Sequence, residues 1–164
     1  MNGIVIADTG PIFSLAIIDK LNLLDSIFNE VFIPKAVWDE ISADETKLFY
    51  DRVIDYFKNK VQPIKGFNDL TFIMDSGESE SVILYKELAA DYLLIDDKKA
   101  RSIAENIGVR CIGTIGLLSF AKDKGFIDAL KPIFEDFIKH KRYYSTDLLN
   151  AILLKTNEEF LRLQ

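Results

Sequence analysis

Short apolar runs alternate with segments of helical periodicity along most of the chain. Runs typical of strands buried on both faces, rich in β-branched and other apolar residues, occupy residues 4–7, 31–34, 61–64, 92–95 and 109–112. Pro63 lacks the backbone donor that a central strand needs, so the third run is expected at an edge of the sheet. The pattern predicts about five short strands.

The segments between these runs have apolar residues at helical spacing. Helices are expected over residues 12–18, 21–28, 35–41, 48–60, 76–89, 98–106, 113–124, 128–139 and 145–156. Gly108 and Gly125 follow two of these segments, as is common where helices end. Strands separated by helices require right-handed crossovers and a mostly parallel sheet, so the predicted fold class is α/β.

The composition fits one domain of this kind. With 164 residues, of which 49% are hydrophobic, the chain can bury a sizeable core. We expect a single domain over 1–164, in which about 126–164 form a helical C-terminal appendage. There is no run of about eighteen uncharged apolar residues and no apolar signal segment before the first strand, so we expect a cytoplasmic protein without membrane contact. Cys111 is the single cysteine, which excludes an internal disulfide.

The charge of the chain limits how it can bind nucleic acid. A net charge of -6 argues against a protein that holds nucleic acid by bulk electrostatics alone. It does not exclude a nuclease, because divalent cations can neutralise a cluster of acids locally.

Acidic side chains recur where the predicted strands end. Asp8 directly follows the first strand, and Asp96 and Asp97 follow the fourth. The carboxyl ends of parallel strands meet at one edge of a sheet, and Glu78 and Glu40, from helices that begin at that edge, are able to face the same cleft. Carboxylates gathered there without a basic partner would repel one another unless cations lie between them. Oxygen-only ligands of this kind suit Mg²⁺ or Mn²⁺.

Each of these acids also has an ordinary structural interpretation. Asp8 is in a position to cap the helix that begins near Pro11, and Glu78 fits the third helical position of a capping box begun by Asp75. One of the two adjacent aspartates of the fourth strand end must cap the helix that follows them. Glu40 alone would be a solvated residue of an amphipathic helix. The argument for a site therefore depends on strand-end acids that occur twice in one α/β pattern.

Four ordered motifs resemble the PIN domain family. They are IVIADTGPIFSLAII, VFIPKAVWDEI, MDSGESESVILYKE and YLLIDDKKARSIAENIGVRCIGTIGLL. More narrowly, the chain is similar to VapC-like members and to prokaryotic PIN-like proteins with a GEAEAI-like helix and an LLIDD-x-x-AR strand end. The resemblance covers nearly the whole chain and implies a three-layer α/β/α fold, with a central, mostly parallel sheet of about five strands and additional C-terminal helices.

The resemblance also implies an activity. PIN domains are metal-dependent ribonucleases, and many are toxins of VapBC-type toxin-antitoxin pairs. The positions that match the family's catalytic and metal-binding acids are Asp8, Glu40, Glu78 and Asp96. Two departures from the family pattern leave the ligand set open. The third acid, Glu78 here, is often aspartate in VapC-like members, and Glu80 is a rival for its role. Asp97 duplicates the fourth acid, Asp96, and is a further candidate ligand.

The implied reaction is hydrolysis of RNA phosphodiester bonds by a metal-bound water that attacks in line. Asp8 and Asp96 would be the principal ligands of Mg²⁺ or Mn²⁺, and Glu40 and Glu78 would complete the shell or orient the water. The hydroxyl of Thr9 would position Asp8 or a phosphate.

Candidate substrate contacts lie near the strand-end acids. Lys98, Lys99 and Arg101 follow these acids and are placed to meet an RNA backbone, although a lysine pair on a helix is commonly a solvated face. The basic run 139–142, with Tyr143 and Tyr144 behind it, combines charge with rings that stack on bases, or is only a turn between helices.

Two other classes of function compete with the nuclease. One is a PIN-like module that no longer cuts and serves in binding or regulation. The other is a phosphotransfer domain of receiver type, which the sequence disfavours because no lysine follows the run 109–112. For the nuclease, the resemblance implies an RNA substrate, a homodimer and a small antitoxin protein as partners.

Overall fold

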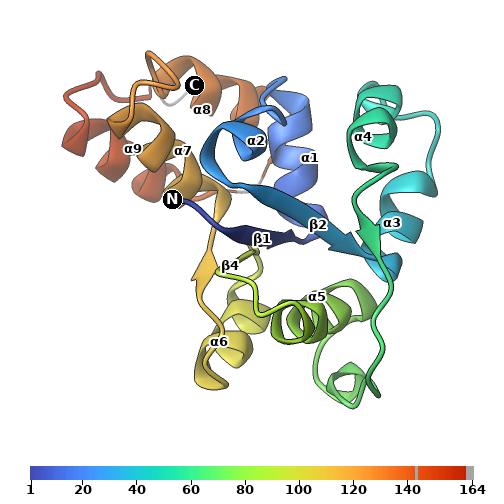
Figure 1. The fold of residues 1–164 in the computed structure, drawn as a ribbon. Coiled ribbons are helices and arrows are strands. Elements are labelled where there is room, and N and C mark those ends of the chain that lie inside the picture. The colour runs from blue at the N-terminus through green and yellow to red at the C-terminus, as the bar shows by residue number, and fades with distance from the viewer. Residues whose placement is uncertain (143, 162–164) are drawn as a thin grey trace.

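The computed structural model, which describes residues 1–142 and 144–161, has a five-stranded sheet at its centre (Figure 1). Its strands are β1 (Ile4–Ala7), β2 (Glu30–Pro34), β3 (Val61–Gln62), β4 (Tyr92–Leu94) and β5 (Cys111–Ile112). All neighbouring strands pair in parallel, in the order β3-β2-β1-β4-β5. Helices cover both faces, so the predicted three-layer α/β/α fold with a central parallel sheet is confirmed.

The helices follow the predicted segments with shifts at their ends. They are α1 (Thr9–Ile17), α2 (Leu23–Ile27), α3 (Lys35–Ser42), α4 (Tyr50–Phe57), α5 (Ser76–Glu87), α6 (Lys98–Asn106), α7 (Thr114–Asp123), α8 (Lys131–Lys139) and α9 (Thr146–Lys155), with a 3-10 turn η1 (Leu70–Phe72) before α5. One example is α8, which begins at Lys131, just before Pro132, and not at residue 128. None of the helices described here is long and apolar enough to cross a membrane.

Side chains of the central strands alternate between two hydrophobic clusters, one on each face of the sheet. Val5 and Ala7 of β1 belong to the cluster under α1, α2 and α7, whereas Ile6 between them belongs to the cluster under α5 and α6. In β4, Leu94 lies on the first face and Leu93 on the second. Both faces of a parallel sheet are buried, which is why the strands read as continuous apolar runs and not as alternating ones. Figure 1 shows α5 and α6 together on one side of the sheet.

The strand order creates a topological switch between β1 and β4. The chain steps outward from β1 through β2 to β3, and then returns to place β4 on the other side of β1. The two strands are joined beyond their ladder by a bond of 2.9 Å from the backbone N–H of Asp8 to the carbonyl of Leu94. Connections that diverge from adjacent strands leave a crevice at the carboxyl ends, and this is where Asp8 and Asp96 lie.

The C-terminal helices share the core of the sheet domain. Phe134 and Phe137 of α8 and Leu149 and Leu153 of α9 are fully buried or nearly so, and they join the same cluster as α1 and α7. The expected helical appendage is thus packed on the face of the sheet that includes α1.

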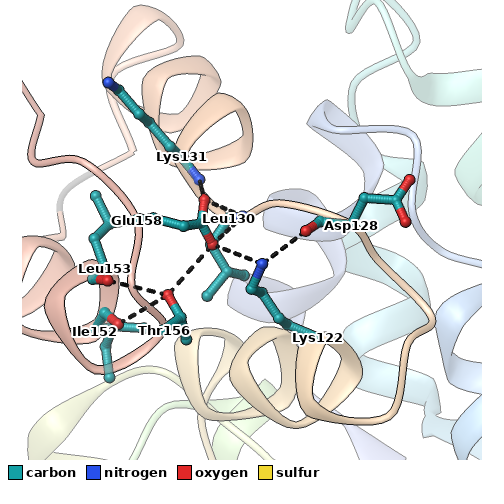
Figure 2. Close-up of polar contacts among 8 residues, drawn as sticks. All are labelled: Lys122, Asp128, Leu130, Lys131, Ile152, Leu153, Thr156 and Glu158. Carbon is teal, nitrogen blue, oxygen red and sulfur yellow. Dashed lines mark hydrogen bonds and ion pairs between the residues drawn. The ribbon is translucent and has the colours of Figure 1, made fainter.

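Glu158 connects the end of the chain to two of these helices (Figure 2). Its carboxylate accepts hydrogen bonds from the backbone N–H of Leu130 at 2.9 and 3.0 Å and of Lys131 at 2.9 Å, where α8 begins. The ammonium of Lys122 on α7 lies 3.1 Å from the same carboxylate. Burial alone disfavours the ionised carboxylate, but these three donors outweigh burial and lower the pKa of Glu158.

We predict that Glu158→Gln lowers the free energy of unfolding by about 1–3 kcal/mol near neutral pH, because the charge-assisted bonds are lost. The folded-state pKa is depressed, so the contribution of the carboxylate is present above its ordinary value of 4.5 and disappears as the pH falls below it. Urea unfolding at several pH values measures both effects. A difference between the two proteins that persists unchanged in acid would contradict this account.

Candidate active site at the carboxyl edge of the sheet

Asp8 occupies the N-cap position of α1 without capping the helix. Its backbone is extended, with φ -86° and ψ 161°, and its side chain makes no capping hydrogen bond. The residue is 8% exposed. No lysine or arginine forms an ion pair with it within the described residues. The capping interpretation of this residue therefore does not hold, and its carboxylate is held at the crevice for another reason.

The surroundings of Asp8 disfavour its negative charge. Burial, the largest cause, raises the pKa of this carboxyl from 3.8 to about 7. The backbone N–H of Thr9 acts in the opposite direction. Three nearby acids raise the pKa further, and these are Asp75, Glu78 and Glu40. At neutral pH the edge thus holds a buried carboxyl that a cation would stabilise in its ionised form.

Asp8 and Asp96 flank the same small residue. A Cβ atom added at Gly10 would lie 3.7 Å from Cβ of Asp96 and 3.9 Å from Oδ2 of Asp8. Glycine at this position keeps the space between the two acids free of a side chain. The carboxylate of Asp8 and Cβ of Asp96 therefore both lie beside Gly10, whereas the acids whose charges act on Asp8 are Asp75, Glu78 and Glu40.

Unlike Asp8, Asp96 is surrounded by hydrogen-bond donors. Its Oδ1 accepts from the backbone N–H of Thr114 at 2.7 Å. Its Oδ2 accepts from the hydroxyl of Thr114 at 2.8 Å and from the hydroxyl of Tyr144 at 2.6 Å. Thr114 is the first residue of α7, so Asp96 also satisfies a free N–H at that helix end.

Glu40 is linked to the end of β1 through Thr9. The buried hydroxyl of Thr9 donates a hydrogen bond of 2.7 Å to Oε2 of Glu40 on α3. The same oxygen would lie 3.5 Å from a Cβ atom added at Gly77, near the start of α5. Thr9, predicted to position Asp8 or a phosphate, therefore positions Glu40.

Glu78 and Asp97 make the helix-end contacts that the sequence allowed. Glu78 completes a capping box with Asp75, whose Oδ1 accepts from the N–H of Glu78 at 2.8 Å. Asp97 caps α6 by accepting from the N–H groups of Lys99 and Ala100. Burial and then the charge of Asp75 raise the pKa of Glu78. The charge of Glu78 in turn raises the pKa of Asp8. Metal ligation by Glu78 and Asp97 stays a prediction.

Glu80, the rival of Glu78, lies in another environment. Its Oε2 accepts a hydrogen bond of 2.9 Å from the backbone N–H of Ala36 in the first turn of α3. The contact ties α5 to α3 and engages this carboxylate at a helix end.

The basic residues expected to meet the substrate lie in the first turns of α6. Lys98 and Lys99 are exposed, and Lys99 lowers the pKa of Glu78 through its charge. Arg101 pairs with Glu105 at 2.8 Å, while its guanidinium would lie 3.5 Å from a Cβ atom at Gly113. These cations therefore border the acidic edge.

Sequence reasoning missed several residues of the site, namely Ser14, Asp75, Thr114, Arg142 and Tyr144. The sequence predicts Asp75 only as a helix cap, although its place before a helix at the carboxyl edge is a usable signal. Tyr144 and Arg142 lay in the basic and aromatic run considered for base stacking, and no local pattern indicates that they reach Asp96 and Gly10. Tyr143 of that run lies outside the described residues.

A sequence model of the PIN domain family matches residues 4–158. The chain belongs to the PIN domain family. No curated protein matches the sequence. PIN domains are generally metal-dependent nucleases that typically use divalent ions, so membership indicates a nuclease-type function.

The residues of this PIN domain fit such a cation in their donor chemistry. Asp8 is buried among acids, and Asp96 lies across Gly10 from it. Within 1–142 and 144–161, no three Asp, Glu, His or Cys side chains are close enough to form a complete metal-binding group. Mg²⁺ commonly binds through only one or two carboxylates and keeps several waters, so a site based on Asp8 and Asp96 suffices for it.

We predict that Asp8→Asn stabilises the metal-free PIN domain at alkaline pH. The folded-state pKa of Asp8 is raised, so its stabilising contribution is complete below 3.8 and is lost as the pH rises through about 7. A pKa shift of this size corresponds to a gain of at most about 4 kcal/mol in the free energy of unfolding of Asp8→Asn over the wild type at high pH. Denaturant unfolding in a chelator, near about pH 8.5 and about pH 5.5, measures the change.

The matched control is Asp55→Asn on α4, where the aspartate is 75% exposed. It should leave unfolding nearly unchanged at both pH values. Equal stability of Asp8→Asn and the wild type in chelator at high pH would show that burial of this carboxylate has no energetic cost.

Proposed function

We propose that this PIN domain is a metal-dependent endoribonuclease that hydrolyses RNA phosphodiester bonds, and that it is the toxin of a VapBC-type pair. The observation that supports the nuclease best is the buried Asp8, which has acidic neighbours and lies across Gly10 from Asp96. Such an arrangement is costly without a cation and favourable with one. Family membership supports the choice of a phosphodiester as substrate.

The acids have distinct tasks in this proposal. Asp8 and Asp96 would hold Mg²⁺ or Mn²⁺, and Glu40, fixed by the Thr9 hydroxyl, would orient a water at the edge of the site. Glu78 adds negative charge from the start of α5 and is available to complete the shell. The bound cation would lower the pKa of a water and neutralise charge on the phosphodiester.

The RNA backbone is proposed to run along the start of α6. Lys98 and Lys99 are exposed there, and Arg101 lies beside Gly113 at the same edge. Contacts from these residues to phosphates would hold the strand without reading its sequence. The net charge of -6 makes such local cations necessary.

The partners proposed for the toxin are a second copy of the chain and a small antitoxin protein. Support comes from the family and from apolar side chains that the fold leaves in solvent. Phe67 and Phe72, on either side of the start of η1, are each 87% exposed, and Leu48 before α4 is 95% exposed. Contiguous apolar surface is what typically binds another protein, and these three side chains are the proposed contacts.

A PIN-like module without nuclease activity is the second candidate. The observation that favours it is the use of Glu78 and Asp97 as helix caps, together with the lack of a complete metal-binding group among the described side chains. Such a module would use the same surfaces for binding or regulation.

RNA cleavage by the purified protein separates the two candidates. The nuclease predicts degradation that requires Mg²⁺ or Mn²⁺, stops with chelator, and falls at least about 100-fold in Asp8→Asn. Asp55→Asn should cleave like the wild type. Weak activity that is equal in wild type and Asp8→Asn and independent of metal would identify a contaminant and favour the inactive module.

Gly10→Ala tests the site without removing a charge. The added methyl group would be in ordinary van der Waals contact with Asp96 and Asp8 and would narrow the space between them. We expect a folded protein with reduced Mn²⁺ binding and reduced cleavage. Full activity in this variant would place the metal away from the Asp8 and Asp96 pair.

A further inference from the structure

Resting on the metal-dependent function proposed above, we infer that Tyr144 is a positioning residue of the site. Together with Thr114 it occupies Oδ2 of Asp96, so that Asp96 binds a cation through Oδ1 alone. Tyr144, which lies just before α9 and outside the sheet, thereby determines which oxygen of Asp96 is available to a cation.

The carboxylate of Asp96, which only accepts, and the guanidinium of Arg142, which only donates, decide most hydrogen-bond directions in the network. A carboxylate only accepts, so the single hydroxyl proton of Tyr144 points to Oδ2 of Asp96, at 2.6 Å. Ser14 then has one hydroxyl proton for two acceptors, the Tyr144 oxygen at 2.8 Å and the carbonyl oxygen of Gly10 at 3.1 Å. Nε of Arg142 donates to the Ser14 oxygen at 3.0 Å and completes the chain. Burial and the adjacent Asp96 raise the pKa of Tyr144 to about 12, so the phenol keeps its proton.

The two oxygens of Asp96 are unequally occupied. Oδ2 receives two donors, the hydroxyls of Thr114 and Tyr144, whereas Oδ1 receives only the backbone N–H of Thr114. Each carboxylate oxygen has about two lone-pair sites. One site on Oδ1 therefore remains, and bidentate binding by Asp96 is blocked. Mg²⁺ and Mn²⁺ accept monodentate carboxylates, whereas Ca²⁺ readily takes bidentate ones.

Tyr144 is fixed independently of Asp96. Its ring lies 5.1 Å from that of Phe137 on α8, between centroids. Arg142, two residues before it, donates to the carbonyl of Gly10 at 2.9 Å. The contacts of Glu158 hold the start of α8 and the end of α7 at the other end of this helical unit. The phenol is thus held by the packing of α8 as well as by its bond to Asp96.

Tyr144→Phe removes only the hydroxyl and keeps the ring packing. Titration calorimetry with Mn²⁺ and with Ca²⁺, separately, gives the readout. We expect the Kd for Mn²⁺ to rise about 10-fold or more, as is common when a ligand loses its supporting hydrogen bond. The Kd for Ca²⁺ should stay the same or fall, because Oδ2 becomes available. The matched control is Tyr85→Phe. The hydroxyl of Tyr85 accepts a 3.3 Å hydrogen bond from the backbone N–H of Arg110, just before β5 and away from the carboxyl edge of the sheet.

The outcomes separate this inference from the function on which it rests. A Tyr144→Phe protein with the Mn²⁺ to Ca²⁺ affinity ratio of the wild type overturns the inference, whether both affinities are unchanged or fall in parallel. Equal Mn²⁺ affinity of wild type and Asp8→Asn would instead refute the proposed metal site. If Tyr144→Phe does not fold, Thr114→Val is tested in the same way, and the same direction of shift is expected because Oδ2 of Asp96 loses its other donor.

Discussion

The burial of one carboxylate at the end of the central strand is the constraint on which the site depends. β1 is covered on both faces and bonded on both sides, so the residue that follows it cannot easily reach solvent. Asp8 is that residue, and its neighbours include other acids. A neutral residue there would serve the fold better by up to about 4 kcal/mol at high pH. An acid retained at such a cost is typical of a functional position.

The two principal acids are prepared in opposite ways. Asp8 has few donors and a raised pKa, whereas Asp96 receives three hydrogen bonds from Thr114 and Tyr144. The surroundings of Asp8 would favour a nearby positive charge, whereas the hydrogen bonds to Asp96 fix the position of its carboxylate. In the proposed metal site, Asp8 would attract the cation and Asp96 would define where it lies.

The fold and the strand-end acids were predictable from sequence because they follow from local rules. Continuous apolar runs indicated strands covered on both faces, and adjacent parallel strands necessarily brought Asp8 and Asp96 to one edge. The capping box of Asp75 and Glu78 was equally readable from its spacing. Pro63 correctly placed β3 at an edge of the sheet.

What the sequence did not indicate depends on tertiary contacts. The bond from Tyr144 to Asp96 joins residues 48 positions apart, and neither spacing nor periodicity predicts it. The Thr9 bond to Glu40 depends in the same way on how α3 packs beside α1. Helix ends also shifted, as at α8, where the first N–H groups are bonded by the distant Glu158.

Anomalous scattering from a crystal grown with saturating Mn²⁺ tests the central claim most directly. The account predicts a peak between Asp8 and Asp96, within ligating distance of the Asp8 carboxylate and of Oδ1 of Asp96. A crystal in which both acids keep their positions and Mn²⁺ binds elsewhere, or not at all, would contradict it.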